Sequence, residues 1–568
     1  MRISVGVAVA LLLIFAVAPV VLVVGDSFLS GDGGLTLSHY VRAFAPAYRL
    51  TLLGNSLLIA TLSTLIALAI GVPYAFFCTR VRTPLRGLFS ALYILPLVLP
   101  PLLMIMSWSS FLLSLRDETT GLGPARYLGG IGGVAFILGI SYFPFIVLFA
   151  RKAFTDIGAG LEEAARMTAG PLAAFAKVTL RLSTPAILAG ALFVFLFSIA
   201  DFSVTDYVSI VADTEGTVRA YPFEAFQIYG TNFTDAKLGH REGAALGLPL
   251  ALLCIGLLFV LMWLVRKDRH VTVTSGHRRV EDVEAKSSPA TKVAFRAAGF
   301  LFLLAALTLS VVVPVGWITA SAVKPAAAKT APDGTVVTAG GGLVDNLRRT
   351  LLDPGNALPD VGASLLYSAI AAVVMVLIAA VLGHHMVRAG PRREATVMTL
   401  AFLPLAFGPI MFGAGLIRMW NHSALEINGE NAVYDGLLIV IFMLVGKYLP
   451  FALAAVGSSV RRIDRRYEEV AAVAGVRPAR RMFEIVSPMI VPGLVGGLVL
   501  GFVFAMRELD TRAMLSAGGT RSAILTIYRW VHFFRDEWVW SLCLVLIVLI
   551  GLPFLLYVLL LSKRIRVL

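Results

Sequence analysis

Residues 468–475 read EEVAAVAG and residues 162–170 read EEAARMTAG, so two polar stretches 306 residues apart carry nearly the same pattern. Each joins acidic residues to alanines and a glycine, and each is followed by a basic amphipathic stretch and an apolar segment that contains proline. Both interrupt a chain that otherwise consists largely of long apolar runs. A duplicated polar loop in such a chain favours a docking element for another protein.

The composition indicates a membrane protein. Of the 568 residues 58% are hydrophobic and 14% are charged, and the mean hydropathy is +0.86. A soluble fold could not bury that much apolar surface, whereas a bilayer removes the need to do so. The alternating ten-residue segments of a membrane barrel do not occur in the sequence. We therefore expect an all-α polytopic fold. The three cysteines (Cys78, Cys254 and Cys543) lie far apart in apolar runs, which favours neither a disulfide framework nor a metal site.

About twelve runs of roughly 20 apolar residues are long enough to cross a bilayer. The first run continues beyond the length of a cleaved secretion signal, so we interpret it as a retained span. The spans expected in the first half are 3–24, 52–78, 88–115, 131–150, 186–205 and 244–265. Those expected in the second half are 297–320, 364–387, 396–419, 436–456, 489–507 and 539–561.

The distribution of charge sets the expected orientation. With a cytoplasmic N-terminus, the inward-facing segments hold 30 of the 48 Lys and Arg residues and 12 of the 34 Asp and Glu residues. This excess agrees with the positive-inside rule and places both termini in the cytoplasm. The net charge of +14 then reflects topology and attraction to anionic membrane lipid, and it requires no nucleic-acid partner.

The two halves of the sequence repeat each other at offsets of 306 to 312 residues. Residues 95–101 (LPLVLPP) correspond to residues 403–409 (LPLAFGP). Gly190 and Asp201 likewise correspond to Gly497 and Glu508, respectively. Since each half has six spans, the halves share one orientation and form two parallel six-helix repeats. Such halves place a substrate path between them.

The repeat also predicts the domain organisation. We expect a first half at residues 1–266, a cytoplasmic linker at residues 267–296 and a second half at residues 297–568. The linker is polar with mixed charge, as is typical of a flexible tether. Residues 321–362 form the longest expected outside loop, with a surface helix around residues 343–352.

The two polar stretches are the expected docking elements. Residues 467–474 predict a short helix that Gly475 ends, because glycine adopts the left-handed conformation at low cost. Pro478 suits the first turn of the next helix. Small alanines leave a low face that can enter a groove on a partner, although a solvated elbow is the alternative for a single copy. The residues expected to dock are Glu162, Glu163, Ala164, Ala165, Gly170, Glu468, Glu469, Ala471, Ala472 and Gly475.

The pattern Glu-Ala-Ala, three residues, Gly, then a hydrophobic residue and Pro resembles the coupling-loop signature of permease subunits of bacterial binding-protein-dependent ABC importers. Glu469, Gly475, Ile485 and Pro488 keep the spacing of that signature, with a valine in place of its first alanine. In the first copy Gly170 comes one residue late, and no proline stands where Pro488 does. The resemblance covers nearly the whole chain, and two fused halves look like the ferric-iron, thiamine and aminoalkylphosphonate permeases.

The resemblance implies import across the bacterial cytoplasmic (inner) membrane. It implies that an extracytoplasmic substrate-binding protein delivers the substrate, with ferric iron as the first candidate. It also implies that two copies of a cytoplasmic ABC ATPase drive alternating access. The sequence contains no Gly-x4-Gly-Lys-Ser/Thr loop. We therefore expect a transport subunit that is not an enzyme and holds no cofactor or metal, with ATP bound and hydrolysed by the partner subunits.

Five residues are expected along a translocation path: Lys447, Asp201, Glu508, Pro100 and Pro409. Lys447 falls near the middle of an expected span, where a charge is costly and often functional, although it could also snorkel or face water. Asp201 and Glu508 fall towards the outer ends of their spans, where ordinary loop-entry residues are the alternative. Pro100 and Pro409 break the third span of each half, either as unwound backbone beside a path or as plain kinks.

The alternative function is an ion-coupled secondary transporter with twelve spans. Carriers of this kind usually place several carboxylates within the membrane, and the major facilitator class has a Gly-x3-Asp-Arg-x-Gly loop after its second span. Here that loop reads TRVRTP at residues 79–84, and no carboxylate falls at the midpoint of an expected span. Dependence of uptake on ATP, and not on an ion gradient, distinguishes the two.

Overall fold

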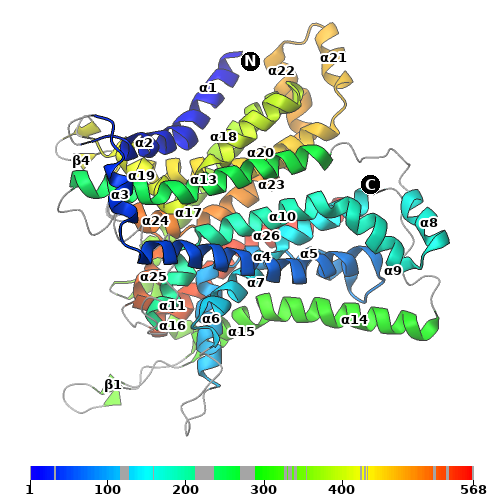
Figure 1. Ribbon diagram of the computed structural model, residues 1–568, viewed down its shortest axis with the longest axis horizontal. Coiled ribbons are helices and arrows are strands. Elements are labelled where there is room, and N and C mark those ends of the chain that lie inside the picture. Colours follow the sequence, from blue (N-terminus) through cyan, green and yellow to red (C-terminus); the bar gives the residue numbers. More distant parts are fainter. Residues whose placement is uncertain are drawn as a thin grey trace. The chain divides into compact units, whose positions relative to one another are not determined.

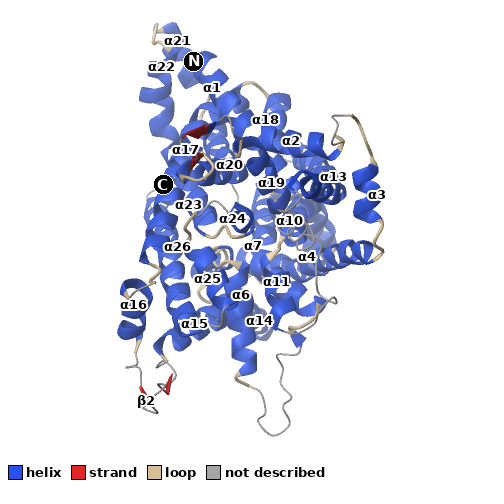
Figure 2. Ribbon diagram, turned by 90° about the vertical axis from the view of Figure 1, so that its left-hand side faces the viewer, coloured by secondary structure: helices blue, strands red, loops and turns tan. Residues whose placement is uncertain are grey.

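The part of the chain that the structure describes folds almost entirely into helices (Figure 2). The computed structural model describes residues 2–30, 34–115, 127–157, 159–211, 236–268, 288–324, 329–330, 336–337, 342–353, 355–422, 425–427, 430–431, 433–515, 520–532 and 536–565. Within these ranges the strands form two short antiparallel pairs, β1 (Lys329–Thr330) with β2 (Val336–Val337) and β3 (Glu426–Ile427) with β4 (Glu430–Asn431).

The described helices confirm an all-α polytopic fold. Ten of them are long and apolar enough to cross a membrane, and two sharply bent pairs bring the number to twelve if each pair is one span. Together they coincide with the twelve apolar runs predicted from the sequence. The ten are Ser4–Ser27, Tyr48–Arg80, Ile131–Asp156, Pro171–Ala200, Arg241–Val260, Pro289–Val323, Leu358–Arg388, Leu437–Arg462, Pro478–Met506 and Trp538–Tyr557.

Contacts divide the chain into two compact units, and neither unit is a simple half of the sequence. Unit 1 comprises Met1–Pro46, Ala225–Ile255 and Ile318–Leu568. Unit 2 comprises Ala47–Glu224 and Gly256–Trp317. Two helices contribute residues to both units, namely α13 (Ala236–Asp268) and α15 (Val313–Val323).

Unit 2 is built on three helices that pack against one another, α4 (Tyr48–Arg80), α7 (Ile131–Asp156) and α10 (Arg181–Ala200) (Figure 1). A Cβ at Gly190 would press on the backbone of Ile146, so glycine permits α10 to approach α7 closely. The other elements of the unit are α5 (Arg86–Leu92), η2 (Leu95–Leu97), α6 (Pro101–Leu113), α8 (Ala159–Thr168), α9 (Pro171–Ala174), η4 (Phe175–Leu180), α11 (Ser203–Val211), α14 (Pro289–Leu307) and η6 (Thr308–Val312).

Unit 1 repeats this core with α17 (Leu358–Arg388), α20 (Leu437–Arg462) and α23 (Ser487–Met506). Gly497 faces Ala452, the repeat counterpart of Ile146, so the same glycine contact recurs. The other elements are α1 (Arg2–Leu12), η1 (Leu13–Val17), α2 (Ala18–Ser27), α3 (Ser38–Phe44), α16 (Leu343–Leu352), α18 (Pro391–Phe407), α19 (Pro409–Trp420), α21 (Arg466–Val473), α22 (Pro478–Arg481), η8 (Met482–Val486), α24 (Asp510–Leu515), α25 (Ala523–His532) and α26 (Asp536–Ile565).

Each unit takes its first membrane helix from the other half of the sequence. In unit 1 the Phe15 ring of η1 stacks on Phe442 of α20, with the ring centroids 4.6 Å apart. A Cβ at Gly446 would overlap the carbonyl oxygen of Phe15, so the close approach requires glycine there. In unit 2 Phe302 of α14 lies 5.6 Å from Phe77 of α4, centroid to centroid. The predicted boundaries at residues 1–266 and 297–568 therefore follow the sequence repeat, whereas the compact units exchange their first helices.

The third span of each half is sharply bent, where the sequence predicted a break. Arg86–Leu97 and Pro101–Leu113 meet at 98°, and Pro391–Phe407 and Pro409–Trp420 meet at 102°. Pro100 interrupts the first because proline cannot donate the backbone hydrogen bond that a helix needs. Gly408 interrupts the second with a φ of +85°, a backbone conformation that residues other than glycine rarely adopt. These angles are far larger than those of an ordinary helix kink.

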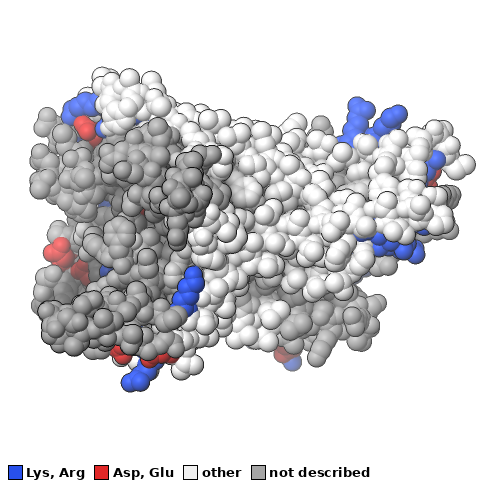
Figure 3. Space-filling model, turned by 90° about the horizontal axis from the view of Figure 1, so that it is seen from below, with Lys and Arg blue, Asp and Glu red and all other residues white. Residues whose placement is uncertain are grey.

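Two predicted surface segments have different outcomes. The helix expected around residues 343–352 is confirmed as α16. Most of the expected linker, residues 269–287, lies outside the described residues. On the face drawn in Figure 3, Lys and Arg side chains gather at the right-hand end, and beside them lies a broad band with few charged groups. Such a band suits contact with hydrocarbon.

Candidate functional site

The two repeated polar stretches form short helices, α8 and α21. Gly475 follows α21 with a φ of +74°, and Val476 N–H donates to the Ala471 carbonyl at 3.0 Å. This geometry confirms the predicted glycine stop. Gly170 differs, because its φ is −59° and it precedes Pro171, the first residue of α9. The two copies therefore share a glutamate-rich helix but end it in different ways.

In the first copy, Glu162 anchors α8 to the rest of unit 2. Its carboxylate is fully buried and lies 3.0 Å from Arg80 Nη2 and 2.7 Å from Arg166 Nη2. The Thr179 hydroxyl donates to the same carboxylate at 2.5 Å. Arg80 Nη2 also donates to the Phe154 carbonyl at 2.8 Å. Because Arg80 ends α4 and Phe154 belongs to α7, one arginine joins the polar helix to two core helices.

In the second copy, Glu468 makes the corresponding attachment within unit 1. Arg388, the last residue of α17, lies 2.7 Å from Glu468 Oε1 through Nη2 and donates to the same oxygen through Nε at 2.8 Å. His384 Nε2 lies 2.9 Å from Glu468 Oε2. Arg388 Nη2 donates to the Ile463 carbonyl at 3.2 Å. This anchor is partly exposed, whereas the Glu162 anchor is buried.

Neither arginine is among the site residues predicted from the sequence. Arg80 and Arg388 stand at the ends of the second expected span of each half, a shared position that the repeat could have revealed. Nothing in the sequence, however, links Arg80 to a glutamate more than 80 residues later. The paired arrangement in two units is the strongest sign that α8 and α21 are held firmly on their cores.

The exposed sides of α8 and α21 carry large apolar residues. Met167 is 85% exposed, Val473 is 91% exposed, and Val470 is exposed as well. Among the residues expected to dock, those with exposed or half-buried positions are Glu163, Ala164, Ala165, Gly170, Glu469, Ala472 and Gly475. Glu162 and Ala471 are buried within their own units. Glu468 is half-buried, and its carboxylate is bound by Arg388 and His384. Each helix therefore exposes apolar side chains together with one of the glutamates expected to dock, and exposed Arg465 pairs with Glu469 on the second copy.

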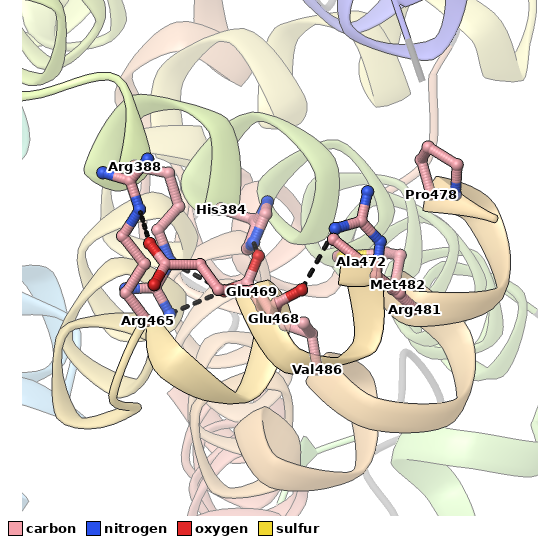
Figure 4. A pocket seen from close by; sticks show the side chains of 10 residues that line it. All are labelled: His384, Arg388, Arg465, Glu468, Glu469, Ala472, Pro478, Arg481, Met482 and Val486. Carbon is pink, nitrogen blue, oxygen red and sulfur yellow. Dashed lines mark hydrogen bonds and ion pairs between the residues drawn. The ribbon is translucent and has the colours of Figure 1, made fainter. Parts of the chain in front are cut away.

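A hollow of about 250 Å³ lies beside α21 (Figure 4). Figure 4 shows His384 and Arg388 from α17 and Glu468 from α21 around it, and Arg481 Nη1 donates to the Glu468 carbonyl at 3.1 Å. Its lining residues are His384, Arg388, Arg465, Glu468, Glu469, Ala472, Pro478, Arg481, Met482 and Val486. A π-helical segment follows in each half (η4 and η8), and such segments are frequent at functional sites.

A second cluster lies in unit 1 around Lys447. This buried ammonium lies 2.6 Å from Glu508 Oε1 and donates to the Thr511 hydroxyl at 3.0 Å. The Tyr448 hydroxyl donates to the other Glu508 oxygen. The structure thus brings together two of the residues expected on the path, Lys447 and Glu508, as an ion pair. Lys447 is 5% exposed and its ammonium ends on Glu508, so it does not snorkel out of the fold, and its place on a path stays a prediction.

The remaining residues that the sequence predicts on a path occupy matching places in the two repeats. Asp201 accepts a hydrogen bond from Val204 N–H at 2.9 Å, and Glu508 accepts one from Thr511 N–H at 2.9 Å. Each acid thus stabilises the start of a short helix, α11 or α24. In unit 2 α11 packs against α6, which follows the bend at Pro100, and in unit 1 α24 packs against α19, which begins at Pro409.

Comparisons with known proteins identify the family. The family described as "Binding-protein-dependent transport system inner membrane component" matches residues 64–267 and again residues 336–567. The ferric transport system permease protein FbpB of Actinobacillus pleuropneumoniae is 24% identical over 532 residues, covering 91% of this chain and 72% of that protein. This long match agrees with the fused two-half arrangement that the sequence resembles.

Shorter permeases match about a third of the chain. The spermidine/putrescine transport system permease protein PotB of Haemophilus influenzae is 32% identical over 221 residues, covering 36% of this chain and 76% of that protein. A probable molybdenum ABC transporter permease of Haloferax volcanii is 32% identical over 217 residues, covering 37% and 71%. With its two family matches, its many apolar helices and its internal repeat, the chain is a multi-pass membrane protein that belongs to the binding-protein-dependent transport system inner membrane components, the permease subunits of ABC importers.

Proposed function

We propose that α8 and α21 are the coupling helices of this permease and dock two copies of a cytoplasmic ABC ATPase. The observation that carries the proposal is the pair of anchors. Each helix is tied to the end of the second span of its half, Arg80 to Glu162 and Arg388 to Glu468. Each also presents exposed apolar side chains, Met167 on α8 and Val470 and Val473 on α21, which suit contact with a partner surface.

The anchors suit a mechanism in which force enters at the coupling helices. When the ATPase copies close on ATP, the docked helices move with them, and the arginine anchors oblige α4 and α17 to follow. The attachment of each coupling helix to its core must be rigid, because a flexible loop would move without displacing the membrane helices. In this proposal ATP is bound and hydrolysed by the ATPase subunits, and the permease itself carries no cofactor and no catalytic step.

We further propose the arrangement around the chain. Both termini face the cytoplasm, as the excess of Lys and Arg in the inward segments supports. An extracytoplasmic substrate-binding protein delivers cargo to a path formed by the two halves. Ferric iron is the proposed cargo, supported by the relatives that match nearly the whole chain and are named ferric transport permeases.

The docking proposal is tested by comparing two exposed valines. Val473→Asp places a charge on α21, and Val344→Asp places the same charge on α16, where the valine is 82% exposed. Burying an apolar valine contributes roughly 1.5–3 kcal/mol, and a buried charge adds a further cost, so Val473→Asp should weaken ATPase association at least about tenfold. Val344→Asp should leave it unchanged. Co-purification with a tagged ATPase measures both.

Two results test the proposal, one for docking of the ATPase and one for the ATP-driven class of transport. Equal recovery of ATPase with both variants would refute docking through α21. Uptake in cells provides an independent check, because the proposal expects it to stop when ATP is depleted and to survive an uncoupler. The opposite pattern would favour the ion-coupled transporter.

A further inference from the structure

Arg512 in α24 is a buried guanidinium that lacks hydrogen-bond partners among the described residues. The residue is 3% exposed, and Nε, Nη1 and Nη2 all lack an acceptor. Its Cζ lies 5.7 Å from the ring centroid of Tyr367, a cation–π contact that occupies none of its N–H donors. An unpaired buried charge opposes folding strongly, so its presence needs an explanation.

The neighbouring charges do not supply the missing partner. Glu508 accepts hydrogen bonds from Lys447, from the Tyr448 hydroxyl and from Thr511 N–H. Its negative charge is therefore offset by Lys447 at 2.6 Å. The adjacent Arg507 and Asp510 have opposite charges and cancel in the sum. The cluster around Arg512 thus keeps one net positive charge.

The first half of the chain shows that the fold does not require this charge. Asp201 corresponds to Glu508, and at the same offset Thr205 corresponds to Arg512. Thr205 is also buried, and its hydroxyl donates to the Phe202 carbonyl at 2.9 Å. A short polar side chain that bonds to its own backbone fills this position in unit 2. The repeated fold alone therefore does not account for an arginine at this position in unit 1.

We propose that Arg512 is an oxyanion subsite of the translocation path. Its planar donors match the oxygen atoms of a carboxylate or phosphate, and such an anion would neutralise the cluster. The proposal rests on the proposed import function and defines the cargo more closely. A metal ion would pass this point as an anionic chelate rather than as a bare cation, and a cationic polyamine would be rejected.

The subsite is tested by ligand-dependent stability of the purified full chain in lipid nanodiscs. The probes are citrate, ferric citrate and inorganic phosphate at low millimolar concentration, with spermidine as the cationic comparison. A ligand that binds the folded chain raises its unfolding temperature, and the rise grows with the logarithm of the ligand concentration divided by its dissociation constant. The variants are Arg512→Met, which removes the charge, Arg512→Lys, which keeps it, and Thr205→Val as the matched control in the first half.

We expect at least one of the oxyanions to stabilise the wild-type chain and the Thr205→Val chain, and spermidine to stabilise neither. Arg512→Met should bind that anion roughly 10- to 100-fold more weakly, as expected for the loss of a charge-assisted hydrogen bond, and Arg512→Lys should retain part of the effect. Without anion, Arg512→Met should unfold at the same or a higher temperature than the wild type, because an uncompensated charge has been removed.

Two results would overturn the subsite. One is that the anions stabilise Arg512→Met as strongly as the wild type, which would indicate the general salting effect of such ions. The other is that none of the anions stabilises the wild-type chain. Binding of the wild-type chain to its ATPase is measured separately, so a failure of the subsite and a failure of the import function are told apart.

Discussion

At the scale of single residues, each coupling helix depends on one glutamate and one arginine. The two anchors differ in their surroundings, because Arg80 and Glu162 are buried whereas Arg388 and Glu468 are partly exposed and share His384. A buried ion pair adds little net stability, but a buried charge that loses its partner is costly. The same substitution should therefore have unequal effects in the two halves.

Arg80→Gln should destabilise the chain by about 1–3 kcal/mol, because buried Glu162 keeps Arg166 but loses its second cation, and the Phe154 carbonyl loses a donor. Arg388→Gln should cost less, since water and His384 still reach Glu468. Adding Glu162→Gln to Arg80→Gln should recover much of the loss. Denaturant unfolding of the purified chain measures the differences. Equal stability of the single and double Arg80 variants would contradict the assignment of this pair.

At the scale of elements, most of the fold could be predicted and the bends could be located but not measured. Runs of about 20 apolar residues identify a span because length and hydropathy alone determine whether a helix can cross. Pro100 and Gly408 reveal where the third spans break, since each opposes helical backbone locally. Beyond each break α6 packs against α11 and α19 against α24, contacts between segments that no local pattern records. The π-helical segments η4 and η8 have no sequence signal that we recognise.

Gly408→Ala should destabilise the chain by about 1–3 kcal/mol, because a side chain at φ +85° and ψ 152° is strained even in open space. Gly54 provides the matched control, since it also has open space around it but lies within α4. Gly54→Ala should be neutral or stabilise by up to about 1 kcal/mol. Thermal unfolding compares the two, and a Gly408→Ala chain as stable as the wild type would show that the bend does not need glycine.

In the candidate site too, features set by neighbouring residues could be predicted from the sequence, whereas contacts between distant residues could not. The glycine stop after α21 followed from neighbours within a few residues, and it is confirmed. The anchors and the ion pair of Lys447 join residues that are 60 or more positions apart in the sequence. The lack of hydrogen-bond acceptors around Arg512 depends on all the residues that surround it in the fold. Those features become visible only when the helices are packed.

At the scale of the whole molecule, the exchange of first helices makes the two halves interdependent. The sequence repeat predicts two similar halves but gives no indication that residues 1–46 belong with residues 318–568. The sequence of a hydrophobic helix does not indicate which of two similar helical cores it will pack against. The contacts of Phe15 with Phe442 and of Phe302 with Phe77 decide that here.

A chain divided between residues 276 and 277 should therefore remain one complex. Each fragment would contain a first helix that belongs to the unit formed mainly by the other. Expressed together, fragments 1–276 and 277–568 should co-purify in detergent. Removing residues 2–30 from the first fragment should weaken that association at least about tenfold, because the helix buries several large apolar side chains. Fragments that separate freely with residues 2–30 present would contradict the exchange.

The exchange also bears on the order of events during synthesis. The ring that receives Phe15 is made more than 400 residues after it, and ribosomes add about 5–20 residues per second. The first helix must therefore wait in the bilayer for roughly 20 to 90 seconds before its final neighbour exists. During that interval the faces of α1 and α2 that later pack against unit 1 are exposed to lipid, to the insertion machinery and to nascent copies of the same chain. Joining both halves in one polypeptide ensures that the correct neighbour arrives at the right place and in equal number.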